Sequence, residues 1–198
     1  MSQQNAMELV EKLYGTQRRE GLEKFSVQHP KDVVDYCFLH LQKDNIRIIR
    51  LLNVAILHDV VEDYAQEGYT VERVQAMVGL GPKETKLLDL IARKQDPEYA
   101  YLRDLFAIED GVIVKLADRI ANLKDLQKWV DKEQGFTQRA MDIFETYRFE
   151  TVAMLDLVIL HYAEQMQDPD HPISRQVQLL QEVFRDLETR YKEAKRQK

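Results

Sequence analysis

Apolar residues recur at three- and four-residue intervals along almost the whole chain, which is the spacing typical of amphipathic helices. Residues that break helices are scarce, because the sequence holds only 7 glycines and 5 prolines. The pattern therefore predicts an all-α protein. The expected helices cover residues 4–14, 30–42, 46–63, 70–78, 82–92, 97–105, 109–131, 136–166 and 174–195.

Local signals support several of these boundaries. Pro30 and Pro82 suit the first turn of a helix, and Thr70 is a suitable N-cap. The sequence GLGP at residues 79–82 is typical of a turn between helices, and DPDHP at residues 168–172 is the best candidate for a linker. We expect one domain over residues 1–167, followed by a helical extension over residues 168–198 that packs on the same domain.

The last expected helix carries an apolar stripe with three- and four-residue spacing. Its members are Ile173, Val177, Leu180, Phe184, Leu187 and Tyr191. Such a stripe more often packs on its own domain. The alternative is that it forms a homodimer.

Composition narrows the class of protein. With 198 residues, 44% of them hydrophobic, the chain is able to bury a core. A net charge of −6 without a long basic block argues against a nucleic-acid or membrane-surface partner. The single cysteine, Cys37, cannot form an internal disulfide, and the N-terminus lacks an apolar signal core, so a cytoplasmic location is expected. No apolar run approaches the roughly 18 residues of a membrane span.

One apolar run, LLNVAILHDVVEDY at residues 51–64, is interrupted by ionisable side chains. They are His58, Asp59, Glu62 and Asp63. Residues four apart share a helix face, so His58 would lie beneath Glu62, and Asp59 beneath Asp63. Burying three carboxylates without a positive partner is costly, and no Lys or Arg occurs from residue 51 to residue 72. A divalent metal would remove that cost. The alternative is that this face meets solvent or pairs with arginines of another helix.

A second run, GVIVKLADRIANLKDL at residues 111–126, has a similar interruption. Asp118 and Asn122 are four residues apart, so they share a helix face and offer a carboxylate beside an amide. Lys115, Arg119 and Lys124 can face away from these two residues. The alternative is that Asp118 belongs to an exposed salt bridge.

Three segments, TQRREGLEKFSVQHP, HDVVED and KLADRIANL, together resemble the metal-dependent phosphohydrolases of the HD-domain family. Within that family the chain is similar to the RelA/SpoT-type alarmone hydrolases, over about residues 17–139. The resemblance implies an HD-domain helical bundle that binds one divalent transition metal, usually Mn²⁺. The implied ligands are His29, His58, Asp59 and Asp118. Two imidazoles and two carboxylates also suit Mn²⁺, Fe²⁺ or Zn²⁺ better than Mg²⁺ or Ca²⁺, which prefer oxygen alone.

The resemblance also implies roles for residues near the metal. Glu62 and Asp63 would orient a bound water and relay protons, and Asn122 would lie near the nucleotide ribose. Arg19 is the better match to the arginine that stacks on the base, with Arg18 as the alternative.

Three more basic residues, Arg93, Lys94 and Arg139, fall near positions where family members contact phosphate. An anionic substrate entering an acidic protein needs such local positive charges. The alternative for each is an ordinary surface charge.

The implied activity is hydrolysis of a small nucleotide, with guanosine-3′,5′-bis(diphosphate) as the substrate and pyrophosphate released from its 3′ side. One alternative is an HD-domain phosphatase of another nucleotide or of a phosphorylated dinucleotide cofactor. An alternative from another class is a helical regulatory or interaction module without turnover.

Overall fold

The computed structural model describes residues 5–38, 45–92 and 100–196, and within these ranges the protein is all-α, as predicted. Its helices are α1 (Ala6–Tyr14), α2 (Gln28–Phe38), α3 (Asn45–Leu57), α4 (Val60–Asp63), α5 (Val71–Val78), α6 (Pro82–Ile91), α7 (Ala100–Phe106), α8 (Glu109–Lys132), α9 (Gln138–His161) and α10 (Pro172–Arg196). Short 3₁₀ turns, η1 (Ala65–Glu67) and η3 (Gln165–Gln167), lie between them. An isolated antiparallel bridge joins Arg18 to Phe25, and the described residues contain no strand.

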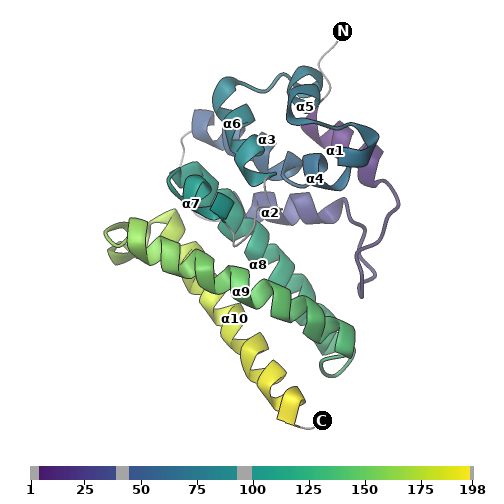
Figure 1. The fold of residues 1–198 in the computed structure, drawn as a ribbon, viewed down its shortest axis with the longest axis vertical. Helices are drawn as coiled ribbons and strands as arrows, with labels where there is room; N and C mark the ends of the chain where they lie inside the picture. The colour runs from purple at the N-terminus through teal and green to yellow at the C-terminus, as the bar shows by residue number, and fades with distance from the viewer. Residues whose placement is uncertain (1–4, 39–44, 93–99, 197–198) are drawn as a thin grey trace.

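The long helix α8 is the centre of the molecule. It packs against the helices α2, α3, α6 and α7, and also against α9 and α10. Figure 1 shows α9 and α10 on one side of α8, with the N-terminal helices on the other. Every residue of α8 from Gly111 to Ala121 is consequently buried, whereas a surface helix buries only one stripe.

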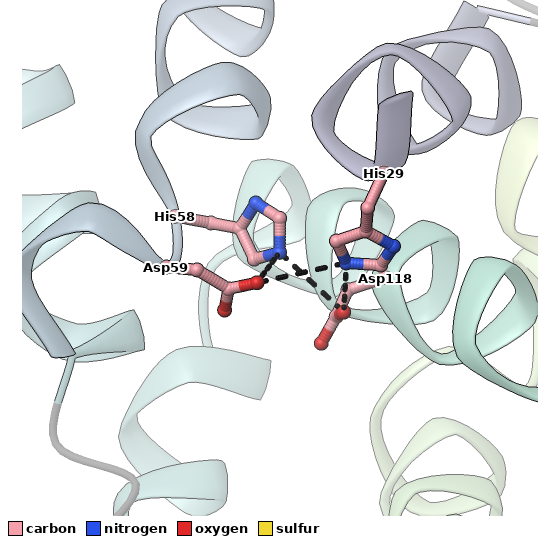
Figure 2. Close-up of side chains that lie close together, drawn as sticks. All are labelled: His29, His58, Asp59 and Asp118. Atoms are coloured by element: carbon pink, nitrogen blue, oxygen red, sulfur yellow. Dashed lines mark ion pairs between the residues drawn. The ribbon is translucent and has the colours of Figure 1, made fainter. Parts of the chain in front are cut away.

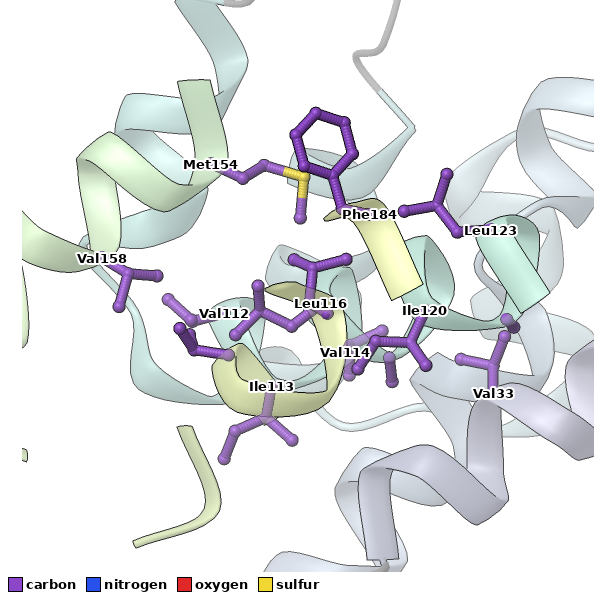
Figure 3. Close-up of a cluster of buried hydrophobic side chains, with 14 of the residues drawn as sticks. Val33, Val112, Ile113, Val114, Leu116, Ile120, Leu123, Met154, Val158 and Phe184 are labelled. Carbon is purple, nitrogen blue, oxygen red and sulfur yellow. The ribbon is translucent and has the colours of Figure 1, made fainter. Parts of the chain in front are cut away.

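The larger hydrophobic core surrounds α8. Figure 3 shows side chains from four helices in this core: Val33 of α2; Val112, Ile113, Leu116 and Ile120 of α8; Met154 and Val158 of α9; and Phe184 of α10. A smaller core, which includes Leu9, Val74 and Leu88, joins α1, α5 and α6. Helix α3 contributes Leu51 to the larger core and Leu57 to the smaller one. The C-terminal end of α3 therefore lies where the two cores meet.

Several predicted boundaries are confirmed. The Thr70 side chain accepts a hydrogen bond from the backbone of Arg73 and caps α5. Gly79 ends α5 in the left-handed conformation, with a φ of 80°, and Pro82 is the first residue of α6. Helix α2 begins at Gln28, so Pro30 lies in its first turn.

Two predicted helices need correction. Residues 46–63 do not form one helix, because α3 ends at Leu57 and α4 begins at Val60. The helix expected over residues 136–166 ends at His161, and η3 follows it. The start of the helix expected at residue 97 lies outside the described residues, which resume at Ala100.

The apolar stripe of α10 is used within the chain. Its members Ile173, Val177, Leu180, Phe184, Leu187 and Tyr191 are between 0% and 8% exposed and belong to the larger core. The stripe therefore packs on the chain's own helices. A homodimer stays a prediction, but it would have to form through another surface. In the described part of the chain, no helix combines the length and apolarity needed to cross a bilayer.

Candidate metal centre

Two histidines and two aspartates from separate parts of the chain converge on one point. His29 comes from the first turn of α2, His58 and Asp59 from the junction of α3 and α4, and Asp118 from the middle of α8. One ligand atom of each residue lies within 4.8 Å of the corresponding atoms of the other three. Figure 2 shows the four side chains pointing toward one another. The structure thus brings together all four residues that the sequence motifs indicate.

Two members of this cluster lie at the interruption between α3 and α4. Adjacent residues of a regular helix diverge by about 100°, so a continuous helix would turn His58 and Asp59 away from each other. With the helix broken between Leu57 and Val60, Nε2 of His58 lies 3.0 Å from Oδ2 of Asp59. Asp59 keeps right-handed helical dihedrals, with a φ of −94° and a ψ of −15°, and the two neighbouring side chains lean toward the same point.

The spacing of the donor atoms fits a bound ion. Nε2 of His29 lies 3.3 Å from Oδ1 of Asp118 and 3.6 Å from Oδ2 of Asp59, and Nε2 of His58 lies 3.5 Å from Oδ1 of Asp118. Two ligands bonded to one ion at about 2.1 Å, at angles of about 90–110°, are about 3.0–3.4 Å apart. The observed separations are close to that range.

The histidine nitrogens support the same interpretation. Among the described residues, Nε2 of His29 and Nε2 of His58 are buried and face carboxylate oxygens of Asp59 and Asp118 at 3.0–3.6 Å without a well-aligned hydrogen bond. Buried polar atoms normally have a partner, and an ion is one of the partners that can satisfy them. The residues present therefore fit a metal site.

The two rings have different proton affinities. Burial lowers the pKa of His29 below its ordinary value, and the positive charge of Arg19 adds to this effect. Burial also opposes the charged form of His58, but Asp59 and Asp118 outweigh it and raise the pKa of His58 to about 10. In the metal-free protein at neutral pH, His29 is neutral and His58 carries a positive charge.

Contacts outside the cluster hold the candidate ligands in place. Nδ1 of His58 lies 2.7 Å from the carbonyl oxygen of Ala55, so Nδ1 is its hydrogen-bond donor and Nε2 faces the cluster. The Asn122 amide donates to Oδ1 of Asp118 at 2.6 Å, and the Lys115 ammonium donates to Oδ2 at 3.2 Å. Both oxygens of the Asp118 carboxylate are therefore oriented by α8 itself.

Lys115 does not face away from the cluster as the sequence suggested, because it contacts Asp118, whereas Arg119 faces α9. Both side chains are buried, at 2% exposure, and both pair with Glu150 of α9. Lys115 thus lies between Glu150 and Asp118. The three-residue spacing of Lys115 and Asp118 was the only local signal for this contact, and the sequence contains no local signal for Glu150.

The predicted acid–base residues lie in α4, directly after Asp59. Oδ2 of Asp63 accepts a hydrogen bond from the Tyr14 hydroxyl at 2.7 Å, a contact that the sequence did not indicate. Burial, together with the charges of Asp59 and Asp63, raises the pKa of Tyr14 far above its ordinary value, so Tyr14 remains a donor. Glu62 is half-buried. The roles of Glu62 and Asp63 stay predictions.

A pocket of about 280 Å³ adjoins the cluster, because Asn122 lines the pocket and also contacts Asp118. Its walls are Arg18, Arg19, Glu20, Leu22, Ser26, Asn122, Asp125, Leu126, Trp129, Ile143 and Tyr147. The guanidinium of Arg19 donates to Asn122 at 2.7 Å and pairs with Asp125 at 2.9 Å. Arg19 is therefore held between the pocket and the residue that orients Asp118.

The other predicted substrate-binding residues have different settings. Arg18 is exposed and its guanidinium lies 4.7 Å from the ring centre of Phe25. Arg139 forms a two-pronged ion pair with Glu20 at the pocket rim, with N–O distances of 2.8 and 3.0 Å. Arg93 and Lys94 lie outside the described residues.

Comparisons with known proteins add no relative. No protein-family model matches the chain, and no curated protein matches it. The structure by itself shows an all-α protein with a buried His-His-Asp-Asp cluster that fits a metal site.

Proposed function

We propose that this protein is a metal-dependent phosphohydrolase of the HD-domain type. We further propose that it acts on a nucleotide, and that this nucleotide is guanosine-3′,5′-bis(diphosphate), from which it releases the 3′-pyrophosphate. The observation that carries the proposal is the convergence of His29, His58, Asp59 and Asp118 beside a pocket that contains arginines and aromatic rings. The particular substrate rests on the resemblance of the sequence motifs.

The four converging residues would hold one divalent transition metal. When bound, such an ion supplies Lewis acidity toward a phosphoryl oxygen and a water of lowered pKa. The chain supplies the orientation, because Ala55 holds the ring of His58 and Asn122 holds Asp118.

The pocket has the features that a nucleotide requires. The rings of Trp129 and Tyr147 line it, and a planar base can stack on such rings. The guanidinium groups of Arg18 and Arg19 also line it, and they offer positive charge and planar stacking surfaces to an anionic ligand. Arg19 is pre-oriented by Asn122 and Asp125, whereas Arg18 is exposed. These contacts support Arg19 as the arginine that meets the base.

The proposed reaction exchanges one bond on phosphorus. The oxygen of water bonds to the phosphorus attached at the ribose 3′ oxygen, and the bond between that phosphorus and the 3′ oxygen breaks. One proton must leave the water and one must reach the 3′ oxygen. We assign these transfers to Glu62 and Asp63, which follow Asp59 in α4 and are of the residue type that performs general acid–base catalysis.

The test combines metal analysis with product analysis. Purified full-length protein, reconstituted with Mn²⁺ and desalted, should hold one ion per chain. It should convert guanosine-3′,5′-bis(diphosphate) to GDP and pyrophosphate. The variant His58→Ala should lose both properties. The matched control is His161→Ala, because His161 is an exposed histidine at the end of α9.

Each departure from this result has a definite meaning. Release of single phosphates from other nucleotides or from a phosphorylated dinucleotide, with the guanosine substrate untouched, would refute the substrate and leave an HD-type phosphatase. Absence of both metal and turnover in the folded wild-type protein would refute the enzyme and favour a helical interaction module. Unchanged metal content in His58→Ala would refute the ligand assignment.

A further inference from the structure

A buried group of charged side chains lies behind the candidate metal centre, on the side of α8 that faces α9. Nζ of Lys115 lies 3.2 Å from Oδ2 of Asp118 and 3.1 Å from Oε1 of Glu150. Arg119 pairs with the other oxygen of Glu150, and the Tyr101 hydroxyl donates to Oε1 at 2.5 Å. Glu150 is thus the common partner of two buried cations.

This arrangement is unusual for the place where it occurs. Apart from Asp118, the neighbouring residues of α8 are apolar, and a buried ammonium or guanidinium group is costly unless an opposite charge accompanies it. Lys115 and Arg119 could be replaced by apolar side chains if they served packing alone, because such a core tolerates residues of similar volume. The two cations instead face one carboxylate of α9 and one carboxylate of the metal centre.

Lys115 is too deeply buried to meet a substrate. Its side chain is 2% exposed, and it is absent from the walls of the pocket. Its link to the site runs through Asp118, whose Oδ2 contacts Lys115 while its Oδ1 faces the two histidines. Lys115 is therefore suited to orient the carboxylate of Asp118 and not to act on a substrate.

The charge of Lys115 has two opposed effects on a cation at the centre. A hydrogen bond from Lys115 fixes the orientation of Asp118, which favours ligation. An uncompensated ammonium beside the same carboxylate would repel a metal ion and compete with it for Asp118. Glu150 reconciles these effects, because it accepts from Lys115 on the side away from the centre and balances its charge.

We propose that Glu150 and Lys115 are positioning residues of the metal centre: Lys115 orients Asp118, and Glu150 compensates Lys115 so that a divalent cation can bind. The inference rests on the proposed metal site. It adds Glu150 as a residue that supports metal affinity from α9, a helix that carries none of the four candidate ligands. Neither residue touches the metal or the substrate.

The test measures Mn²⁺ affinity of the full-length protein by calorimetry, with no substrate present. Glu150→Gln keeps the size of the side chain but leaves both Lys115 and Arg119 without the carboxylate that balances them. It should weaken Mn²⁺ binding by about 10- to 100-fold, the usual loss for a residue that supports a metal ligand. The matched control is Glu145→Gln on the same helix, where Glu145 pairs with Lys195 at 2.6 Å. Its Mn²⁺ affinity should stay within about twofold of the wild type, far below the loss expected at a supporting position.

A double variant keeps the proposal testable if Glu150→Gln does not fold. Lys115→Met with Glu150→Gln removes the ammonium that Glu150→Gln leaves beside Asp118, and both variants deprive Arg119 of its carboxylate partner, so the two differ only at residue 115. The folding of the double variant is checked by circular dichroism in the presence of a chelator. It should bind Mn²⁺ more weakly than the wild type, because Asp118 loses its donor, but more tightly than Glu150→Gln, because no ammonium opposes the ion.

The outcomes separate this inference from the proposed function. A folded wild-type protein without Mn²⁺ affinity would refute the metal site itself. A wild-type protein that binds Mn²⁺, with the folded double variant and, where it folds, Glu150→Gln binding equally well, would overturn only the positioning roles. A double variant weaker than Glu150→Gln would overturn the charge compensation assigned to Glu150.

Discussion

Binding of Mn²⁺ at neutral pH should release about one proton from the protein, and His58 should be its source. The Nδ1 atom of His58 donates to the carbonyl of Ala55, so Nε2 is the nitrogen available to a metal. Nε2 lies 3.0 Å from Asp59, and the carboxylates around it raise the pKa of His58 to about 10. The ion requires the lone pair of Nε2, so the proton on Nε2 must leave. His29 contributes no proton, because its pKa is lowered and its ring is already neutral.

The size of the effect follows from the distance between pH and pKa. At pH 7 the raised pKa of His58 lies about three units above the solution pH, so displacing the proton costs on the order of 4 kcal/mol. Mn²⁺ affinity should therefore rise about tenfold per pH unit as the pH increases toward the pKa of His58. The folding stability of the metal-free protein changes with pH in the opposite direction and falls as the pH rises. The stability that protonated His58 contributes is complete below its ordinary pKa of 6.5 and is lost as pH rises toward 10.

Calorimetry can count this proton. Mn²⁺ is titrated at pH 7 in two buffers with different ionisation enthalpies, and the difference in observed heat gives the number of protons released. The affinity is then measured from about pH 6.5 to about pH 8, where the slope of its logarithm against pH should be close to one. Heats that do not depend on the buffer, together with an affinity that does not depend on pH, would refute the assignment of a charged His58 to the metal-free centre.

Three further predictions concern residues beside the cluster. Glu62→Gln and Asp63→Asn should each retain Mn²⁺ and a helical circular dichroism spectrum while kcat falls by about 10²- to 10⁴-fold, and full activity in both would exclude proton-transfer roles. Tyr14→Phe removes the hydroxyl that donates to Asp63, so the free energy of unfolding in urea should fall by about 1–2 kcal/mol, and an unchanged value would show that this bond contributes nothing. Gly21→Ala should weaken nucleotide binding without changing Mn²⁺ affinity, because a Cβ at this position, where φ is 74°, would lie 2.1 Å from the ring of Trp129. Trp129 is the single tryptophan, so its fluorescence should report the displacement, and an unchanged spectrum with unchanged nucleotide affinity would contradict the prediction.

The helical class and several helix ends could be predicted because their causes are local. Three- and four-residue spacing of apolar side chains indicates a helix wherever it occurs. The cap at Thr70, the left-handed turn at Gly79 and the first-turn proline at Pro82 each depend on groups within a few residues of one another. None of these features requires knowledge of a distant partner.

The interruption after Leu57 and the burial of α8 could not be predicted in the same way. The sequence around His58 has an uninterrupted helical pattern, and the break lies at a cluster whose other members come from α2 and α8. The polar residues Lys115 and Arg119 suggest an exposed face, but α9 covers that face and supplies Glu150, which lies 31 residues beyond Arg119. Local patterns carry the period of a helix and not the identity of what covers it.

The sequence by itself determined that the protein is all-α, and its motifs indicated the four side chains His29, His58, Asp59 and Asp118. Only the tertiary structure decided that their donor atoms lie within 4.8 Å of one another, because α2 and the junction of α3 and α4 must pack against α8 to bring them there. The same packing chose the supporting contacts. Arg19 and Asn122 are 103 residues apart, and Tyr14 and Asp63 are 49 residues apart. Hydrogen bonds over such separations form only after the hydrophobic cores have assembled, so no local pattern in the chain specifies them.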